Sequence, residues 1–149
     1  MCGPTISFPP VSPSRRHAVV EFLARYPSVC EVGVGRRPEV ARALAERGVA
    51  VTATDVHERS VPEGVRFVRD DAVAASERAD PGDAYRAAAV YALDCPPDLH
   101  APLLGLARRV DADLLFTTLG GDPPAVDARP LTLDGETLYV ARERRSSGE

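Results

Sequence analysis

Four short segments of the chain combine glycines or carboxylates in a way that suits the binding of a nucleoside. Glu31-Val-Gly-Val-Gly35 carries two glycines, which permit a tight turn and let a ligand lie against bare backbone. Asp55 follows Gly35 by 20 residues, a spacing at which a carboxylate after a strand accepts hydrogen bonds from ribose hydroxyls. Asp70-Asp71 and Asp94-Cys-Pro-Pro97 are the other two segments. Each segment alone also fits an ordinary turn or helix cap, but their combination favours a nucleoside ligand.

The glycine segment lacks part of the pattern that binds dinucleotides. The pattern G-x-G-x-x-G needs a small residue at its sixth position, where this chain has Pro38. Pro38 also removes one N–H from the helix terminus that would hold a pyrophosphate. Arg36 and Arg37 could bind phosphate instead, so NAD stays open as the less favoured cofactor. S-adenosylmethionine has no phosphate, and Glu31, two residues before the first glycine, is typical of sites that hold its methionine amino group.

The elements that must position these segments follow from the apolar pattern. Short apolar runs predict strands at 28–33, 49–54, 65–68, 87–93 and 114–118. Helical spacing predicts helices at 15–26, 38–47, 72–78 and 98–110. Two alternating runs, 130–133 and 136–141, flank Asp134-Gly135, which is a strong hairpin signal.

This order of elements predicts the α/β class. We expect one doubly wound, Rossmann-like and mostly parallel sheet with a C-terminal β-hairpin. Such a sheet binds ligands beyond the carboxyl ends of its strands, beside the first strand. The four glycine and carboxylate segments each follow a predicted strand, so we expect them to meet at that edge.

The motifs resemble those of known proteins at two levels. Glu31–Gly35 with Asp55 and Asp70/Asp71 resembles the cofactor motifs of class I S-adenosylmethionine-dependent methyltransferases. A narrower resemblance, over about residues 15–141, is to an uncharacterised family of small archaeal proteins, described as Rossmann-like and related to methyltransferases. The segments that carry it are Val29–Gly35, Glu39-Val-Ala, Ala53-Thr-Asp-Val56 and Tyr91–Leu99.

The resemblance implies a role for each matching position. Glu31, Gly33 and Gly35 would line the methionine end of S-adenosylmethionine. Asp55 would bind the ribose, and either Asp70 or Asp71 would bind the adenine amine.

Two departures from the methyltransferase pattern limit what the resemblance implies. Arg37 stands where a third glycine is usual. The fourth segment, Asp94-Cys95-Pro96-Pro97-Asp98, lacks the aromatic residue that enzymes methylating amino nitrogens carry, so we do not expect that activity. Asp94 is the best candidate for a substrate contact or general base, with a helix N-terminal acid as the alternative. Cys95 is a minor candidate for a nucleophile.

Length and composition predict a single domain with short flanking segments. The chain has 149 residues, of which 44% are hydrophobic, enough for one core. Residues 1–13 are rich in proline and are expected to form a flexible lead-in, residues 14–141 the domain, and residues 142–149 a charged tail.

Composition also argues against several classes of protein. A net charge of −4 offers no broad cationic face for nucleic acid. The longest apolar run, 87–93, is far shorter than the roughly 18 residues of a membrane span. The three cysteines and three histidines have no metal-ligand spacing and form no disulfide framework, so no metal is expected. These features, with the absence of a leader sequence, predict a cytoplasmic protein.

The sequence therefore favours a small protein that binds S-adenosylmethionine, as a methyltransferase whose substrate the sequence does not name. The alternative is a non-catalytic domain that senses a nucleotide or docks on a partner, because nothing is inserted between the strands to form a lid. A homo-oligomer or a partner protein would then complete the pocket. An NAD-linked oxidoreductase is a third, less favoured, hypothesis.

Overall fold

The computed structural model describes residues 11–144. Most of the expected lead-in, residues 1–10, and the last part of the expected tail, residues 145–149, lie outside the described range. The strands of the described part are β1 (Ser28–Val32), β2 (Ala50–Asp55), β3 (Val65–Arg69), β4 (Ala89–Ala92), β5 (Asp113–Phe116), β6 (Arg129–Leu133) and β7 (Glu136–Arg142).

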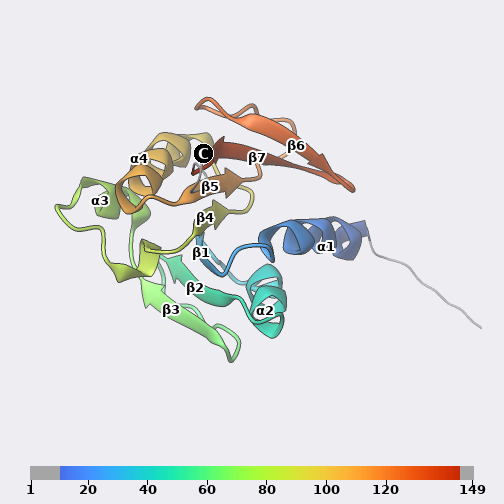
Figure 1. Cartoon of the computed structure of the whole chain (residues 1–149), viewed down its shortest axis with the longest axis horizontal. Helices are drawn as coiled ribbons and strands as arrows, with labels where there is room; N and C mark the ends of the chain where they lie inside the picture. The colour runs from blue at the N-terminus through green and yellow to red at the C-terminus, as the bar shows by residue number, and fades with distance from the viewer. Residues whose placement is uncertain (1–10, 145–149) are drawn as a thin grey trace, which may run out of the picture.

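These strands form one sheet in the order β3-β2-β1-β4-β5-β7-β6 (Figure 1). The five strands from β3 to β5 are parallel to their neighbours, and β7 runs antiparallel to both β5 and β6. The β6–β7 pair turns at Asp134-Gly135, as the hairpin signal predicts. The predicted fold class, a mostly parallel α/β sheet with a C-terminal hairpin, is confirmed.

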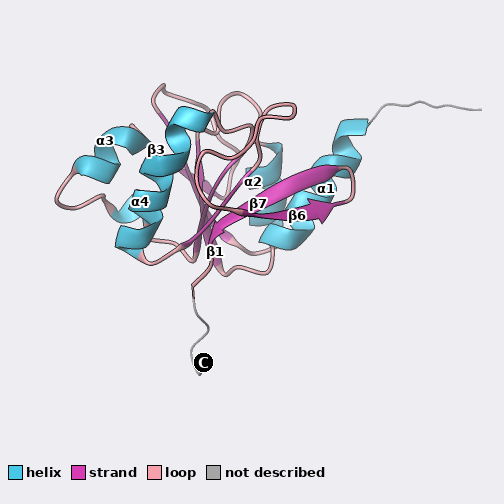
Figure 2. Cartoon of the chain, turned by 90° about the horizontal axis from the view of Figure 1, so that it is seen from above, coloured by secondary structure: helices cyan, strands magenta, loops and turns pink. Residues whose placement is uncertain are grey.

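Helices cover both faces of the sheet, as Figure 2 shows from above. One face carries α1 (Val11–Leu23) and α2 (Glu39–Glu46), and the other carries α3 (Ala72–Glu77) and α4 (His100–Val110). Two short 3-10 helices, η1 (Asp83–Tyr85) and η2 (Pro97–Leu99), precede β4 and α4. Within residues 11–144, no helix has the length and apolar character needed to cross a membrane.

Because both faces are covered, the central strands are buried on both sides, as expected of a parallel sheet. Alternate residues of β1 point into two separate cores: Val29 packs on the α1/α2 side, and Cys30 and Val32 pack on the α3/α4 side. Glu31 shares the orientation of Val29, since strand side chains alternate, and it is buried as well. A carboxyl group thus enters an apolar core next to the glycine turn.

Some element boundaries differ from the predicted ones. Helix α1 begins at Val11, inside the segment expected to be a flexible lead-in, and ends at Leu23. Pro13 does not prevent this, because the first N–H groups of a helix have no intrahelical partner. Strand β4 is shorter than the apolar run 87–93, since the N–H of Ala87 bonds to the turn at Tyr85 and the chain bends away at Asp94.

His100 holds together the two loops that follow β4 and β5. Its ring is fully buried and stacks on Phe116, with 4.1 Å between ring centroids. The N–H of Ala125 donates to Nδ1 at 2.9 Å, so Nε2 carries the proton and donates to the Cys95 carbonyl at 3.2 Å. A neutral histidine therefore positions the Asp94–Pro97 loop against the loop beyond β5.

We expect His100→Ala to lower the free energy of unfolding by about 2–4 kcal/mol, because it leaves a cavity and two unpaired backbone groups. Urea denaturation measures this loss. His17→Ala is the matched control, since His17 is 64% exposed and forms only a surface ion pair with Glu21. An equal loss in the two variants would contradict the role given to His100.

Candidate functional site

The glycine segment forms a turn fitted against the end of β2. The N–H groups of Gly33 and Val34 both donate to the carbonyl of Thr54, at 2.9 and 3.0 Å. Gly33 and Gly35 have φ angles of +74° and +62°, which other residues rarely adopt. A Cβ at Gly33 would meet no described atom within 4 Å. The turn therefore needs glycine for its conformation and leaves open space beside bare backbone.

Asp55 closes β2 and is bonded to the glycine turn. Its Oδ2 accepts the N–H of Gly35 at 2.8 Å, and its Oδ1 accepts the N–H of His57 at 2.9 Å. Burial raises the pKa of Asp55, but these two bonds and the Arg59 guanidinium, 3.4 Å away, outweigh it and lower the pKa. An ionised carboxylate has about four lone-pair directions, so Asp55 keeps acceptor capacity for a ligand hydroxyl.

Asp70 and Asp71 follow β3 but have different surroundings. Asp70 receives two bonds from Arg78, at 2.7 and 3.2 Å, and one from the Tyr85 hydroxyl at 2.8 Å. Its own N–H donates to the Asp55 carbonyl at 2.9 Å, so its backbone lies beside Asp55. The Asp71 carboxylate caps α3 by accepting the N–H of Val73. Of the two residues, Asp70 is the one whose N–H is bonded to Asp55, the residue that accepts a hydrogen bond from the glycine turn.

Glu31 lies beneath the turn with only 2% of its surface exposed. Its Oε1 accepts the hydroxyl proton of Tyr91, a fully buried residue of β4, at 2.7 Å. Burial raises the pKa of Glu31 to about 8, although the Tyr91 bond and the charge of Arg16 act in the opposite direction. The carboxyl group is therefore largely neutral at pH 7.

Asp94 lies just beyond the carboxyl end of β4. Its carboxylate, 45% exposed, pairs with Arg16 of α1 at 3.2 Å, and Arg16 also reaches Glu136 of β7 at 3.3 Å. Its φ angle is +51°, an uncommon value for a residue with a side chain. Thr117 holds the strained loop, since its Oγ1 accepts the Asp94 N–H at 2.7 Å.

Neither Cys30 nor Cys95, the two cysteines within residues 11–144, offers a reactive thiolate. Cys95 is 2% exposed, and burial, with a smaller effect of Asp98, raises its pKa to about 12. Cys30 is fully buried, and burial raises its pKa further. The minor hypothesis of a Cys95 nucleophile therefore has no support in the geometry. Over residues 11–144, no three His, Cys, Asp or Glu side chains are grouped to hold a metal ion.

Three residues near the site escape sequence reasoning. Val56, directly after Asp55, is 50% exposed, which is unusual for an apolar side chain at a strand end. Its position after the strand-end acid was a signal available in the sequence. No signal in the sequence marks Arg16 or Tyr91 as site residues, because their contacts join α1 and β4 to residues far along the chain.

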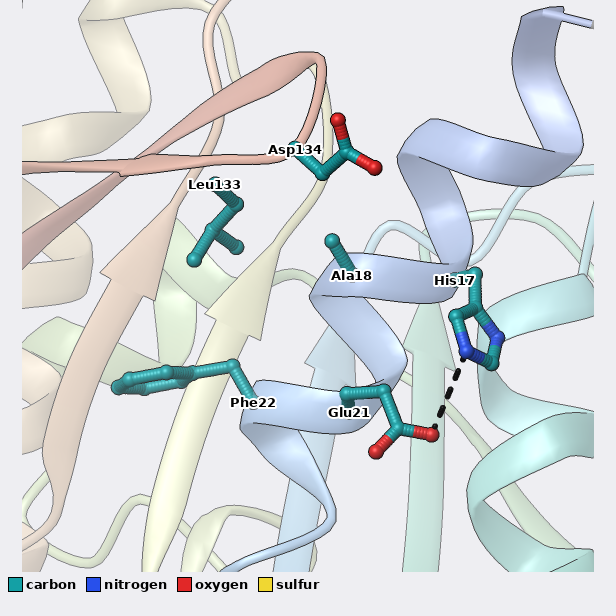
Figure 3. A pocket seen from close by; sticks show the side chains of 6 residues that line it. All are labelled: His17, Ala18, Glu21, Phe22, Leu133 and Asp134. Atoms are coloured by element: carbon teal, nitrogen blue, oxygen red, sulfur yellow. Dashed lines mark ion pairs between the residues drawn. The ribbon is translucent and has the colours of Figure 1, made fainter.

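A hollow in the described surface lies away from the predicted site residues. It has a volume of about 430 Å³ and opens between α1 and the β6–β7 turn (Figure 3). Its lining is His17, Ala18, Glu21, Phe22, Leu133 and Asp134. None of the predicted site residues belongs to this lining.

Comparison with solved structures places this fold among methyltransferases. An RNA methyltransferase from Salinibacter ruber, in complex with S-adenosyl-L-homocysteine, superposes with a TM-score of 0.53 at 16% identity, over 95% of this chain and 97% of that chain. A 1,6-didemethyltoxoflavin-N1-methyltransferase from Burkholderia thailandensis gives a TM-score of 0.50 at 25% identity. That match covers 85% of this chain and 59% of that chain. The chain has the Rossmann-like fold of methyltransferases.

Sequence comparison defines the family. The chain belongs to the Uncharacterised protein family (UPF0146), whose model matches residues 16–144. A UPF0146 protein of Halobacterium salinarum is 51% identical over 127 residues, which are 84% of this chain and 95% of that protein. One from Archaeoglobus fulgidus is 40% identical over 114 residues, covering 76% of this chain and 83% of that protein. The predicted resemblance to an uncharacterised family of small archaeal proteins is confirmed.

The raised pKa of Glu31 predicts how stability depends on pH. The folded value, about 8, lies above the usual 4.5, so the neutral form stabilises the fold at low pH and this contribution is lost as the pH rises through 8. Glu31→Gln is neutral at every pH. The variant should therefore gain stability relative to the native protein between pH 5 and 9, by roughly 2–4 kcal/mol at the upper end.

Urea denaturation at several pH values measures this difference. Glu58→Gln serves as the control, because Glu58 is exposed and its charge is not buried on folding. A stability difference between Glu31→Gln and the native protein that stays constant from pH 5 to 9 would contradict a neutral Glu31.

Proposed function

We propose that the protein binds S-adenosylmethionine at the carboxyl edge of β1, β2 and β4, and that it is a cytoplasmic methyltransferase. The observation that carries the proposal is the contact between Gly35 and Asp55. Their hydrogen bond puts a glycine turn with open space beside an ionised carboxylate at the end of β2. This pair provides bare backbone for a ligand and acceptors for ribose hydroxyls.

The surrounding residues fit the rest of the cofactor. Glu31 and Gly33 would lie at the methionine end, where a carboxyl group and open backbone are available. Val56 offers an exposed apolar surface for the adenine ring, and Asp70, bonded to the Asp55 carbonyl, offers an acceptor for the adenine amine. Asp71 is a weaker candidate because it caps α3.

Asp94 is the residue we assign to the reacting end. Bound S-adenosylmethionine would supply a methyl group whose bond to sulfur breaks as the substrate nucleophile attacks, with the electron pair passing to sulfur. The exposed Asp94 carboxylate would orient the nucleophile and accept its proton.

NAD is the less favoured ligand. Pro38, which precedes α2, has no N–H to offer a pyrophosphate. Arg36 and Arg37 are exposed beside the turn and would be its phosphate contacts. Parallel titration with NAD decides between the two cofactors.

One observation favours a second candidate function, a non-catalytic sensor or docking domain. The connection from β5 to β6, residues 117–128, contains no helix, and the mouth around Asp94 is open. A substrate pocket would then need a second copy of the chain or a partner protein. This candidate shares the cofactor site with the first and differs in having no turnover.

We expect Asp55→Ala to weaken binding of S-adenosylmethionine and S-adenosylhomocysteine by about 1–3 kcal/mol, through loss of a charged hydrogen-bond partner. Isothermal titration measures the affinity, and circular dichroism checks that the variant is folded. Asp83→Ala is the control, since Asp83 is 86% exposed and forms a surface ion pair with Arg86. Unchanged affinity in Asp55→Ala, or tighter binding of NAD, would contradict the proposal.

A measurement of methyl transfer distinguishes the methyltransferase from the non-catalytic sensor or docking domain. The native protein, given methyl-labelled S-adenosylmethionine with pools of RNA, protein or small metabolites, should label one pool. Asp94→Asn should lower that labelling by about 10²-fold or more, as for loss of a general base, without weakening cofactor binding. Binding with no labelling of any pool would favour the sensor.

A further inference from the structure

Thr117 lies directly after β5 and is bonded to the loop that carries Asp94. It is buried, with 1% of its surface exposed. Its N–H donates to the Ala92 carbonyl at 3.1 Å, and its carbonyl accepts the Cys95 N–H at 2.7 Å. Its Oγ1 accepts the Asp94 N–H, also at 2.7 Å. Of these three hydrogen bonds between the ends of β4 and β5, only the one to Asp94 depends on the side chain of Thr117.

Asp94 has a backbone conformation that glycine adopts more easily than other residues. Its φ angle of +51° lies in the left-handed region, where a side chain is disfavoured. Among the described residues other than glycine, Asp111 alone shares this feature, with a φ angle of +57°. Asp111 ends α4, and a left-handed residue is a common way to end a helix. Asp94 ends no helix, so its conformation has another cause.

The left-handed conformation brings a carboxylate out of a buried strand. All four residues of β4, Ala89–Ala92, are buried. Two residues further on, the side chain of Asp94 is 45% exposed and its carboxylate reaches Arg16 of α1. Strained backbone persists only where surrounding contacts enforce it, and such positions are concentrated in functional sites. At Asp94 the enforcing side-chain contact is the hydroxyl of Thr117.

We propose that Thr117 is a positioning residue for methyl transfer, whose hydroxyl keeps Asp94 in the conformation that presents its carboxylate to the substrate. The inference rests on the proposed function. In that reaction, Asp94 accepts the proton that the nucleophile loses as its bond to the methyl group forms and the methyl–sulfur bond breaks. Thr117 is buried, so it acts through Asp94 and not by touching the substrate. A displacement of about 1 Å at the reacting groups lowers a rate strongly, so this hydrogen bond matters for transfer.

The first test measures the conformation of Asp94 and needs no ligand. Asp94→Gly and Asp94→Ala both remove the carboxylate and its ion pair with Arg16, but only glycine adopts a φ angle of +51° without strain. The glycine variant should therefore unfold at a temperature about 2–5 °C higher than the alanine variant. In ordinary backbone the order of these two residues is the reverse. An equal or lower unfolding temperature for Asp94→Gly overturns the inference.

The second test removes the hydroxyl of Thr117 alone. Thr117→Val has nearly the shape of threonine and lacks the acceptor, whereas Thr117→Ser keeps it. With the pool that the native protein labels, Thr117→Val should lower kcat by about 10- to 100-fold without changing the KM for S-adenosylmethionine. Thr117→Ser should keep kcat within about threefold of the native value. A purely structural role would not separate kcat from KM in a variant that circular dichroism shows to be folded.

Thr118→Val is the matched control, because it makes the same change in the next residue, whose Oγ1 donates to the Asp122 carbonyl. Asp111→Gly is the second control, since it changes the other left-handed aspartate. Both controls should leave kcat unchanged. The comparison at Asp94 decides whether or not Thr117→Val folds.

Two results distinguish failure of the inference from failure of the proposed function. A native kcat in folded Thr117→Val overturns the role of Thr117 and leaves the proposed function standing. A native protein that transfers no methyl group to any pool overturns the proposed methyltransferase, and the role of Thr117 with it.

Discussion

Strand β1 is hydrogen-bonded to a parallel strand on each side, β2 and β4, and the position of the whole site depends on this pairing. The chain leaves β1 through α2 on one face of the sheet and returns to β4 through α3 on the other. Because the connections between parallel strands are right-handed, α2 and α3 lie on opposite faces of the sheet. The two connections therefore leave the carboxyl ends of β1 and β4 in different directions, and the space between these strand ends stays open. Glu31 and Asp94 lie on opposite sides of that opening, with the glycine turn between β1 and β2.

Three carboxyl groups at this edge are held in different states by their surroundings. Asp55 is ionised because backbone N–H groups and Arg59 stabilise its charge. Asp94 is exposed and paired with an arginine. Burial raises the pKa of Glu31 and disfavours its charged form, although the hydrogen bond from the Tyr91 hydroxyl acts in the opposite direction. The same chemical group, a carboxyl, therefore provides a hydroxyl acceptor, a candidate base and a largely neutral acid at one edge of the sheet.

Much of the fold was accessible to sequence reasoning because its signals are local. Apolar runs and helical spacing located the strands and helices, and Asp134-Gly135 located the hairpin, since turn chemistry is decided by neighbouring residues. Boundaries were less accessible. Two examples are the start of α1 at Val11 and the short strand β4. Both boundaries depend on tertiary contacts between the helices and the sheet, and a short stretch of sequence does not reveal those contacts.

The sequence by itself determined which residue types stand at the strand ends, because alternating strands and helices bring every parallel strand end to one edge. It could not determine the state of those residues. Only the tertiary structure decided that Glu31 is buried with Tyr91 as its hydrogen-bond partner and that Arg16 pairs with Asp94. These contacts join segments up to 78 residues apart, and burial and charge depend on such long-range packing.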